Sequence, residues 1–194
     1  MLPDNELSSN PVPAVFIGGG ALPVRDTVDY ELGGIALNDP SEGLQYQIWR
    51  ARIESEDTEI IIDAQNVDPF VLITGVDITE VSISFDQNMN PVVAYVEDGT
   101  AKLYWYDSTV HGMVTTSFPT IVTPRVSMDD KRKSQSQNND VIFAYMKNSN
   151  LYMRMQRDRY SVEYLLAENV DSPGLIKIGM SRQNRFQFMF RNPE

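Results

Sequence analysis

The sequence contains no cysteine, which excludes disulfide bonds, thiolate metal sites and a thiol nucleophile. Its single histidine, His111, excludes a histidine-rich metal site. No apolar run approaches the roughly 20 residues of a membrane-spanning helix. The polar, acidic start, MLPDNELSSN, is unlike a signal or transit peptide. These absences leave a chain without a membrane span and with few options for metal or nucleophilic chemistry.

Basic residues are scarce in the first half of the chain. Residues 1–100 carry 3 Lys and Arg against 18 Asp and Glu, a net charge of −15, whereas residues 101–194 carry 13 against 9, a net charge of +4. The overall charge of −11 argues against wrapping of DNA or RNA. The asymmetry permits head-to-tail contact between the acidic and basic halves of neighbouring copies, or it is a chance imbalance of a solvated surface.

What the sequence does contain is an internal repeat. Residues 91–107 read PVVAYVEDGTAKLYWYD, and residues 140–158 read DVIFAYMKNSNLYMRMQRD. Ala144 lies 144 − 94 = 50 positions after Ala94 in the same Ala-Tyr context. A period near 50 residues made of short strands is typical of propeller blades, which bury their apolar faces against neighbouring copies.

Short alternating segments between turn residues predict antiparallel strands along the chain. Two complete units of four strands are expected at about 80–120 and 125–170, with partial units on either side at 28–75 and 175–190. No segment shows sustained helical spacing. We therefore expect an all-β fold of antiparallel, propeller-like blades with less than about 10% helix, or alternatively a β-sandwich.

The predicted domain organisation is an extended N-terminal arm over residues 1–27 followed by a β domain over 28–194. The arm holds four prolines and an apolar AVFI at 14–17, so we expect it to lie on another subunit, or else to be a floppy terminus. The polar insertion at 129–140 is expected to be a mobile loop. About three blades are too few for a closed propeller of 4–8 blades, so the sheets either form an open stack or close between subunits.

Residues that could carry chemistry do not form a recognisable catalytic pattern. His111 follows Asp107 and Ser108 in one turn, which does not give the geometry of a Ser-His-Asp triad. Asp86, Asn88 and Asn90 suit a hairpin turn better than a calcium loop. An acidic cluster meets neither the glycosidase nor the calcium spacing; its members are Glu54, Glu56, Asp57, Glu59 and Asp63.

Two further patterns are weak. Gly18-Gly19-Gly20 lacks the Lys-Ser/Thr of a phosphate-binding loop. Arginines and aromatics alternate near the C-terminus and could stack on bases, line a sugar site or simply occupy opposite strand faces; they are Arg154, Arg157, Arg159, Arg182, Arg185 and Arg191 with Tyr152, Tyr160, Phe186, Phe188 and Phe190. We therefore predict no catalytic, cofactor-binding or metal-binding residue, no cofactor and no enzyme activity.

The placed strands resemble virion tail proteins of short-tailed bacteriophages. The resemblance rests on VDYELGGIALNDPSEGLQYQIWRARI, LYMRMQRDRYSVEYLL and RFQFMFRNP, and ISFDQNMNPVVAYVEDGTAKLYWYD is similar to the repeating unit of their propeller-bearing nozzle and hub proteins. It spans residues 28–192. It implies a late, structural protein of the virion tail: a nozzle, hub, adaptor or fibre-docking subunit in a homo-oligomeric ring through which DNA leaves, in contact with other tail proteins.

Two other classes stay open. One is a carbohydrate-binding or sialidase-like propeller, although the Ser-x-Asp-x-Gly-x-x-Trp box is absent. The other is a cellular interaction scaffold. No sequence-specific nucleic acid, membrane span or small-molecule substrate is expected.

Overall fold

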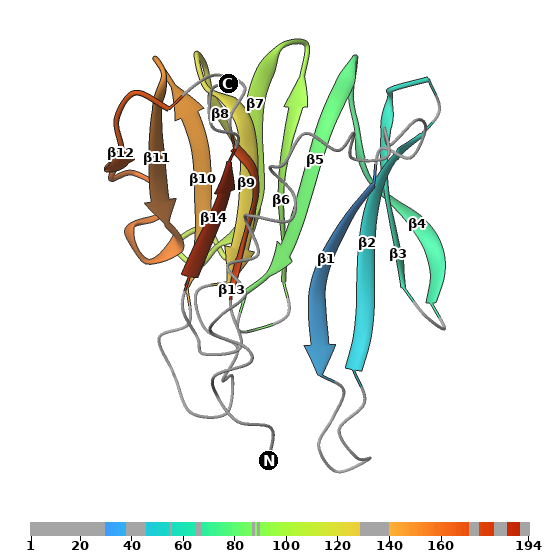
Figure 1. Ribbon diagram of the computed structural model, residues 1–194. Helices are drawn as coiled ribbons and strands as arrows, with labels where there is room; N and C mark the ends of the chain where they lie inside the picture. The colour runs from blue at the N-terminus through green and yellow to red at the C-terminus, as the bar shows by residue number, and fades with distance from the viewer. Residues whose placement is uncertain are drawn as a thin grey trace, which may run out of the picture.

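The computed structural model describes residues 30–37, 46–54, 56–64, 67–86, 88, 90–128, 140–170, 175–180 and 186–190 (Figure 1). The arm predicted at 1–27, Gly18-Gly19-Gly20 and residues 129–139 of the loop predicted at 129–140 lie outside the described residues. Among the described residues the secondary structure is almost entirely strand, and the helical part is one 3-10 turn, Gln156–Asp158. The all-β prediction is confirmed.

The strands form antiparallel sheets in which consecutive strands are neighbours. Each of the first three sheets has four strands, and the last has two. The first sheet comprises β1 (Tyr30–Leu37), β2 (Tyr46–Glu54), β3 (Glu59–Ala64) and β4 (Val67–Thr74). The second sheet comprises β5 (Ile78–Phe85), β6 (Pro91–Glu97), β7 (Thr100–Asp107) and β8 (Gly112–Phe118). The third sheet comprises β9 (Val122–Met128), β10 (Val141–Lys147), β11 (Asn150–Met155) and β12 (Tyr164–Ala167), and the fourth comprises β13 (Leu175–Met180) and β14 (Phe186–Phe190).

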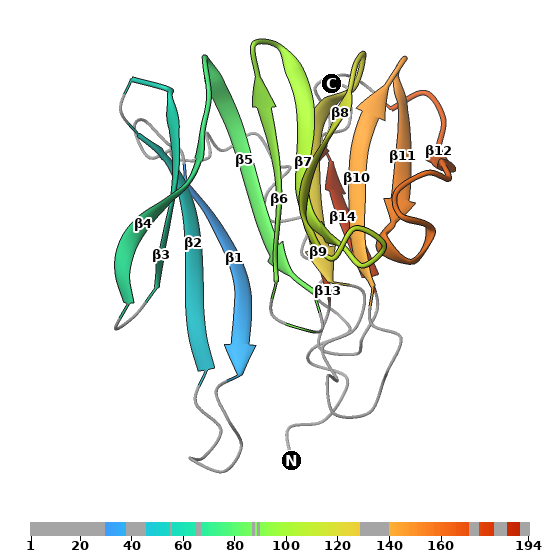
Figure 2. The same ribbon diagram turned by 180° about the vertical axis from the view of Figure 1, so that it is seen from behind.

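The sheets follow one another through their first strands. β1 contacts β5, β5 contacts β9, and β9 contacts β13. Figures 1 and 2 show the first sheet at one side of the molecule, the second in the middle and the third at the other side. Each junction encloses its own apolar cluster, so the chain has three cores between sheets rather than one.

The sequence prediction of a partial unit before residue 80 is wrong. β3 pairs with β2 and β4 pairs with β3, which gives the first sheet four strands. The residues of β3 and β4 are strand formers, EIIIDA and VDPFVLIT, and they extend the β1–β2 hairpin. The partial unit at the C-terminal end of the described residues is present as the two-stranded β13–β14 sheet.

The repeat seen in the sequence has a structural basis. Tyr95 and Tyr145 occupy the fifth position of β6 and β10, the second strands of their sheets, and both face the preceding sheet. Ala94 and Ala144, which directly precede these tyrosines, face the following sheet and are fully buried. Ala51 of β2 is equally buried at the corresponding position, three residues before the end of its strand. A methyl group at this point allows the next sheet to approach closely.

Two local features shape these strands. β1 contains a bulge of one extra residue, because Gly33 pairs with Trp49 whereas Ile35 pairs with Ile48. The last strand of the third sheet begins at Tyr164, because Ser161 donates its backbone N–H to the Asp158 carbonyl and closes the preceding turn.

Candidate functional site

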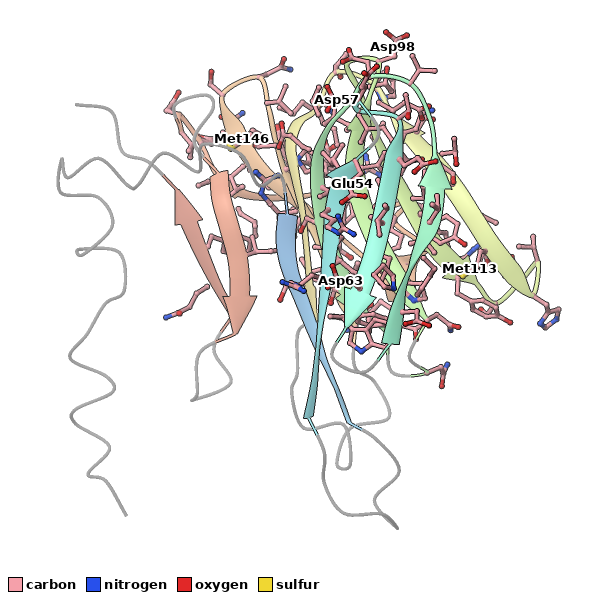
Figure 3. All side chains as sticks on the ribbon, turned by 90° about the vertical axis from the view of Figure 1, so that its right-hand side faces the viewer. Glu54, Asp57, Asp63, Asp98, Met113 and Met146 are labelled. Atoms are coloured by element: carbon pink, nitrogen blue, oxygen red, sulfur yellow. The ribbon has the colours of Figure 1, made fainter. Side chains whose placement is uncertain are left out.

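The face of the first sheet that points away from the second sheet packs on no other described sheet, and we call it the open face. It consists of Arg50, Arg52, Glu54, Glu59, Ile61, Asp63 and Val71. Their neighbours in sequence, including Ala51, Ile60 and Ile62, pack against the second sheet. Since side chains alternate along a strand, the residues of the open face point the other way. Figure 3 looks onto this sheet and labels Glu54 and Asp63.

The open face differs in chemistry from the equivalent faces of the other sheets. The hairpin closing pairs Glu54–Glu59 and Glu97–Thr100 align β2–β3 with β6–β7. This alignment puts Arg50, Arg52 and Asp63 where the second sheet has Val93, Tyr95 and Tyr104, which pack on the first sheet. The third sheet likewise presents Phe143, Tyr145 and Tyr152 to the second. At the positions of Arg50 and Arg52 the first sheet therefore carries charges where the other two carry apolar and aromatic side chains, whereas at the position of Asp63 the second sheet has Tyr104 and the third has Arg154.

The charges of the open face are paired with one another. Arg50 Nε donates to Asp63 Oδ1 at 2.7 Å, and Arg52 Nε donates to Asp63 Oδ2 at 3.2 Å. Arg52 also forms an ion pair with Glu54. The Asp63 side chain is 11% exposed, whereas that of Arg50 is 52% exposed. A nearly buried carboxylate thus holds two guanidinium groups, and that of Arg50 presents its outer edge to solvent.

An apolar strip crosses the same face. Ile61 pairs with Arg52 on one side and with Val71 on the other. Ile61 is buried, whereas Val71, on the edge strand β4, is 48% exposed. Pro69 and two register shifts interrupt the pairing of β4, which makes this edge a poor template for an added strand. The open face itself, rather than the β4 edge, is the surface available for a partner.

The predicted acidic cluster is divided between two places. Glu54, Glu59 and Asp63 belong to the open face, whereas Glu56 and Asp57 occupy the β2–β3 turn with positive φ of 55° and 64°. In that turn the Asp57 carbonyl accepts a hydrogen bond from Ile78 N and the Thr58 carbonyl accepts one from Gly75 N. Asp57 lies with Asp98 at one end of the strands (Figure 3). These turns fasten the first sheet to the second through the backbone.

Three buried carboxylates organise turns at the opposite strand ends. Asp86 accepts hydrogen bonds from the backbone N–H groups of Asn88 and Asn90 and from Asn90 Nδ2, in keeping with the predicted turn role. Asp140 accepts the backbone N–H of Arg157 and pairs with its Nε at 2.7 Å. The carboxylates face inward while the guanidinium of Arg157 is 61% exposed.

Asp107 is the third of these carboxylates and has no triad partner. Its Oδ1 accepts hydrogen bonds from the backbone N–H and the hydroxyl of Thr109, and its Oδ2 accepts one from Arg159 at 2.5 Å. The hydrogen bond from Arg159, followed by that from the Thr109 backbone, lowers the pKa of Asp107 from 3.8 to about 2. His111 is exposed, with a φ of 54°. The sequence interpretation of a structural turn is in keeping with these contacts.

The predicted mixture of arginine and aromatic residues includes a buried network between the second and third sheets. Arg154 Nε donates to the Tyr145 hydroxyl at 2.8 Å, and this hydroxyl bonds Glu163 at 2.5 Å. Lys147 Nζ also donates to Glu163, at 3.1 Å. Burial of Tyr145, then its bond to Glu163, raises the pKa of the tyrosine hydroxyl. Although burial opposes the change, the hydrogen bonds from Tyr145 and Lys147 lower the pKa of Glu163.

Tyr160 joins this network through its backbone carbonyl, which accepts a hydrogen bond from Arg154 Nη1 at 2.7 Å. Its ring packs edge-on against Trp105 and Phe143, with centroids 5.0 and 6.3 Å away. Its hydroxyl is buried without a hydrogen-bond partner among the described residues. Burial raises the pKa of this hydroxyl strongly, and the charges of Asp140 and Asp86 add to the effect. The aromatic residues here pack between sheets. Arg154 lies on the same strand face as Tyr152 and contacts Tyr145, so the expected placement of arginines and aromatics on opposite faces does not hold at this position.

The described part of the chain contains no group of three or more His, Asp or Glu residues placed to hold a metal ion. Within the same residues no helix has the length and apolar character needed to cross a membrane. The paired charges and the exposed Val71 make the open face the candidate interaction surface. No protein-family model and no curated protein matches the chain.

Proposed function

We propose that this protein is a structural subunit of the tail of a short-tailed bacteriophage, and that it works in an assembly with copies of itself. The role is that of a nozzle or hub, adaptor or fibre-docking ring protein located in the virion tail. Its consecutive antiparallel sheets correspond to propeller blades. The resemblance of residues 28–192 to such tail proteins motivates the assignment.

The observation that supports an assembly role is the open stack of sheets. Each of the second, third and fourth sheets packs on the sheet before it, through β1–β5, β5–β9 and β9–β13. A unit of this kind buries its faces only against neighbours. The described residues supply three complete sheets and a two-stranded fourth, fewer than a comfortable closed propeller. Closure between subunits would satisfy the remaining faces.

The contacts of the charged residues also favour a structural role over an enzymatic one. Asp63, Asp107 and Asp140 each engage arginine, and Asp86 engages the backbone of its own turn. The hydrogen bonds and ion pairs of these carboxylates stabilise turns and strands. The carbohydrate-binding alternative would need several exposed aromatics, whereas Trp105, Tyr145 and Tyr160 are buried between sheets and Phe70 is the one exposed aromatic among the described side chains.

Two measurements test this proposal. Sedimentation equilibrium of the purified chain over a wide concentration range should reveal a fixed oligomer, and quantitative mass spectrometry of virions of the encoding phage should detect the protein at a stoichiometry matching that oligomer. A chain found only in infected-cell extracts and never in virions would contradict the tail assignment. Hydrolysis of a chromogenic sugar by the purified chain would instead favour the sialidase-like alternative.

A further inference from the structure

We infer that the open face of the first sheet docks the last sheet, β13–β14, of a second copy. The inference deepens the proposed function, on which it rests for its biological meaning, because it names the two surfaces that join copies. The contact is heterologous: two different surfaces meet, so repetition of the same contact generates a ring if the rotation closes.

The argument begins with the relation between adjacent sheets. The face of the second sheet toward the first is covered, as is that of the third toward the second, and Ile178 and Phe188 of the fourth sheet pack on the third. Only the first sheet lacks a described neighbour on the corresponding side. If the fourth sheet of one copy packed on the open face of the first sheet of the next copy, the face-to-face packing of consecutive sheets would continue from one copy to the next.

The last sheet offers a face for this contact. Phe188 of β14 packs into the core beneath the third sheet, whereas the adjacent Gln187 is exposed. Since neighbouring residues on a strand point to opposite faces, Gln187 lies on the side away from the third sheet. Gln187 thus marks the outward side of the last sheet, as Arg50 marks the outward side of the first.

The chemistry of the open face suits a protein partner. The guanidinium of Arg50 is held by Asp63 at 2.7 Å and is still 52% exposed, so its remaining donors are pre-oriented for carbonyl or amide groups. Val71 provides apolar area beside the charges. Arginine is enriched in protein interfaces, where it combines planar donors with an apolar stem.

The size of the face predicts a weak contact. The contact is limited by the smaller partner, because the last sheet has two described strands of 6 and 5 residues. Two strands spaced about 4.8 Å apart and about 17–20 Å long make a face of roughly 200 Å² in projection, against roughly 400–600 Å² for the four strands of the open face. A standard interface buries about 800 Å² on each partner. A pair of copies should therefore associate weakly, and the assembly should depend on several such contacts closing together.

Two substitutions with matched chemistry test whether the open face is the interface. Arg50→Glu and Arg159→Glu each reverse a half-exposed arginine that is paired with a nearly buried carboxylate, Asp63 or Asp107. Only Arg50 lies on the open face. Arg50→Glu should weaken self-association by about tenfold or more, whereas Arg159→Glu should change it less than about threefold. Equal effects of the two changes would overturn the inference, and circular dichroism checks that both variants fold.

Cross-linking identifies the partner surface and does not depend on the charge reversal. Because the chain has no cysteine, each introduced cysteine is unique. Arg50→Cys and Gln187→Cys full-length chains are mixed and treated with a bismaleimide that spans about 10 Å, the separation of packed sheets. Ser117→Cys, at an exposed site on β8, replaces Arg50→Cys in the control mixture.

A mixed dimer of the Arg50→Cys and Gln187→Cys chains, well above the control, is the expected result. Dimers that link Arg50→Cys only to itself would mean a symmetric contact and would overturn the inference. An oligomer without the mixed cross-link would overturn this contact while leaving the assembly role intact. A chain that is monomeric at every concentration and binds no tail protein would overturn both.

Discussion

The open face of the first sheet and the packed faces of the second and third sheets occupy equivalent positions in their sheets but carry different kinds of side chain. At aligned positions the second sheet has Val93 and Tyr95, and the first has Arg50 and Arg52. Valine and tyrosine require permanent cover because their burial supplies the driving force. Paired arginines tolerate water, so their face can be covered or bare. The difference separates contacts that fold the chain from a contact that can form later.

The largest loss of stability should follow when an aromatic residue of a packed face is truncated. Phe143 of β10 is fully buried and contacts Phe118, Tyr145 and Tyr160. Phe143→Ala should lower the free energy of unfolding by about 3–5 kcal/mol, because it removes apolar contacts and leaves a cavity. Urea unfolding followed by intrinsic fluorescence measures it. A loss below about 1 kcal/mol would mean that the interface between the second and third sheets contributes little to folding.

A smaller loss is expected where the packed faces need a small side chain. Ala94 of β6 is fully buried between the second and third sheets. Ala94→Leu should destabilise the fold by about 1–3 kcal/mol through overpacking. Ser117→Leu, at an exposed site of the same sheet, serves as the control and should change stability by less than about 0.5 kcal/mol. Equal melting temperatures for the two variants would argue against close approach at the alanine.

Two buried tyrosines of one interface should respond oppositely to loss of their hydroxyl groups. Tyr145 bonds Glu163 and Arg154, so Tyr145→Phe leaves two charged groups short of a partner and should cost about 1–3 kcal/mol. Tyr160 has no partner for its buried hydroxyl, so Tyr160→Phe should be neutral or stabilising. Thermal unfolding of the two variants and of the native chain measures the change in stability caused by each substitution. A destabilised Tyr160→Phe variant would point to a hydrogen-bond partner for that hydroxyl.

The ion pair between Asp107 and Arg159 should be visible in the dependence of stability on pH. The pKa of Asp107 is lowered from 3.8 to about 2 in the folded chain. Its stabilising contribution is therefore complete above pH 4 and is lost as the pH falls toward 2. Asp107→Asn should remove this part of the acid sensitivity. Urea midpoints measured from pH 5 to pH 2 test it, and unchanged slopes in the variant would contradict the assignment.

The smallest effect on folding is expected on the open face. Arg50→Ala removes one exposed partner of Asp63, which keeps its bond to Arg52. Exposed ion pairs contribute little, so the free energy of unfolding should fall by less than about 1 kcal/mol. Thermal unfolding of dilute protein measures it. A loss comparable with that of Phe143→Ala would show that the open face is part of the folding core.

The second and third sheets were predictable from sequence because their strands alternate and their turns are short. β6 and β7, for example, are joined through Asp98 and Gly99, and the strand alternation around Ala94 and Ala144 made the repeat visible. The first sheet was underestimated because its longer turn and its charged residues hide the same pattern. Ala51, followed by Arg-Ile-Glu, carries the signal that Ala94 carries with Tyr-Val-Glu.

The open face could not be assembled from sequence alone. The sequence indicated an acidic cluster that included Asp63, but the pairing of Asp63 with Arg50 depends on the register between β2 and β3. The same holds for the bond from Arg159 to Asp107, two residues 52 positions apart. Contacts of this kind follow from the stacking of sheets and leave no periodic signal in the chain.

The order of the strands has a consequence for synthesis of the chain on the ribosome. Each sheet is a meander of consecutive strands, so the first sheet has all its strands once Thr74 has emerged. Its apolar side must then wait for the second sheet to end at Phe118, 118 − 74 = 44 residues later, which takes roughly 2–9 s at usual elongation rates. The opposite side packs on no other described sheet of the same chain and carries the ion-paired Arg50, Arg52 and Asp63. Because water solvates these charges, the apolar side is the part of the first sheet that can aggregate while the second sheet is still being synthesised.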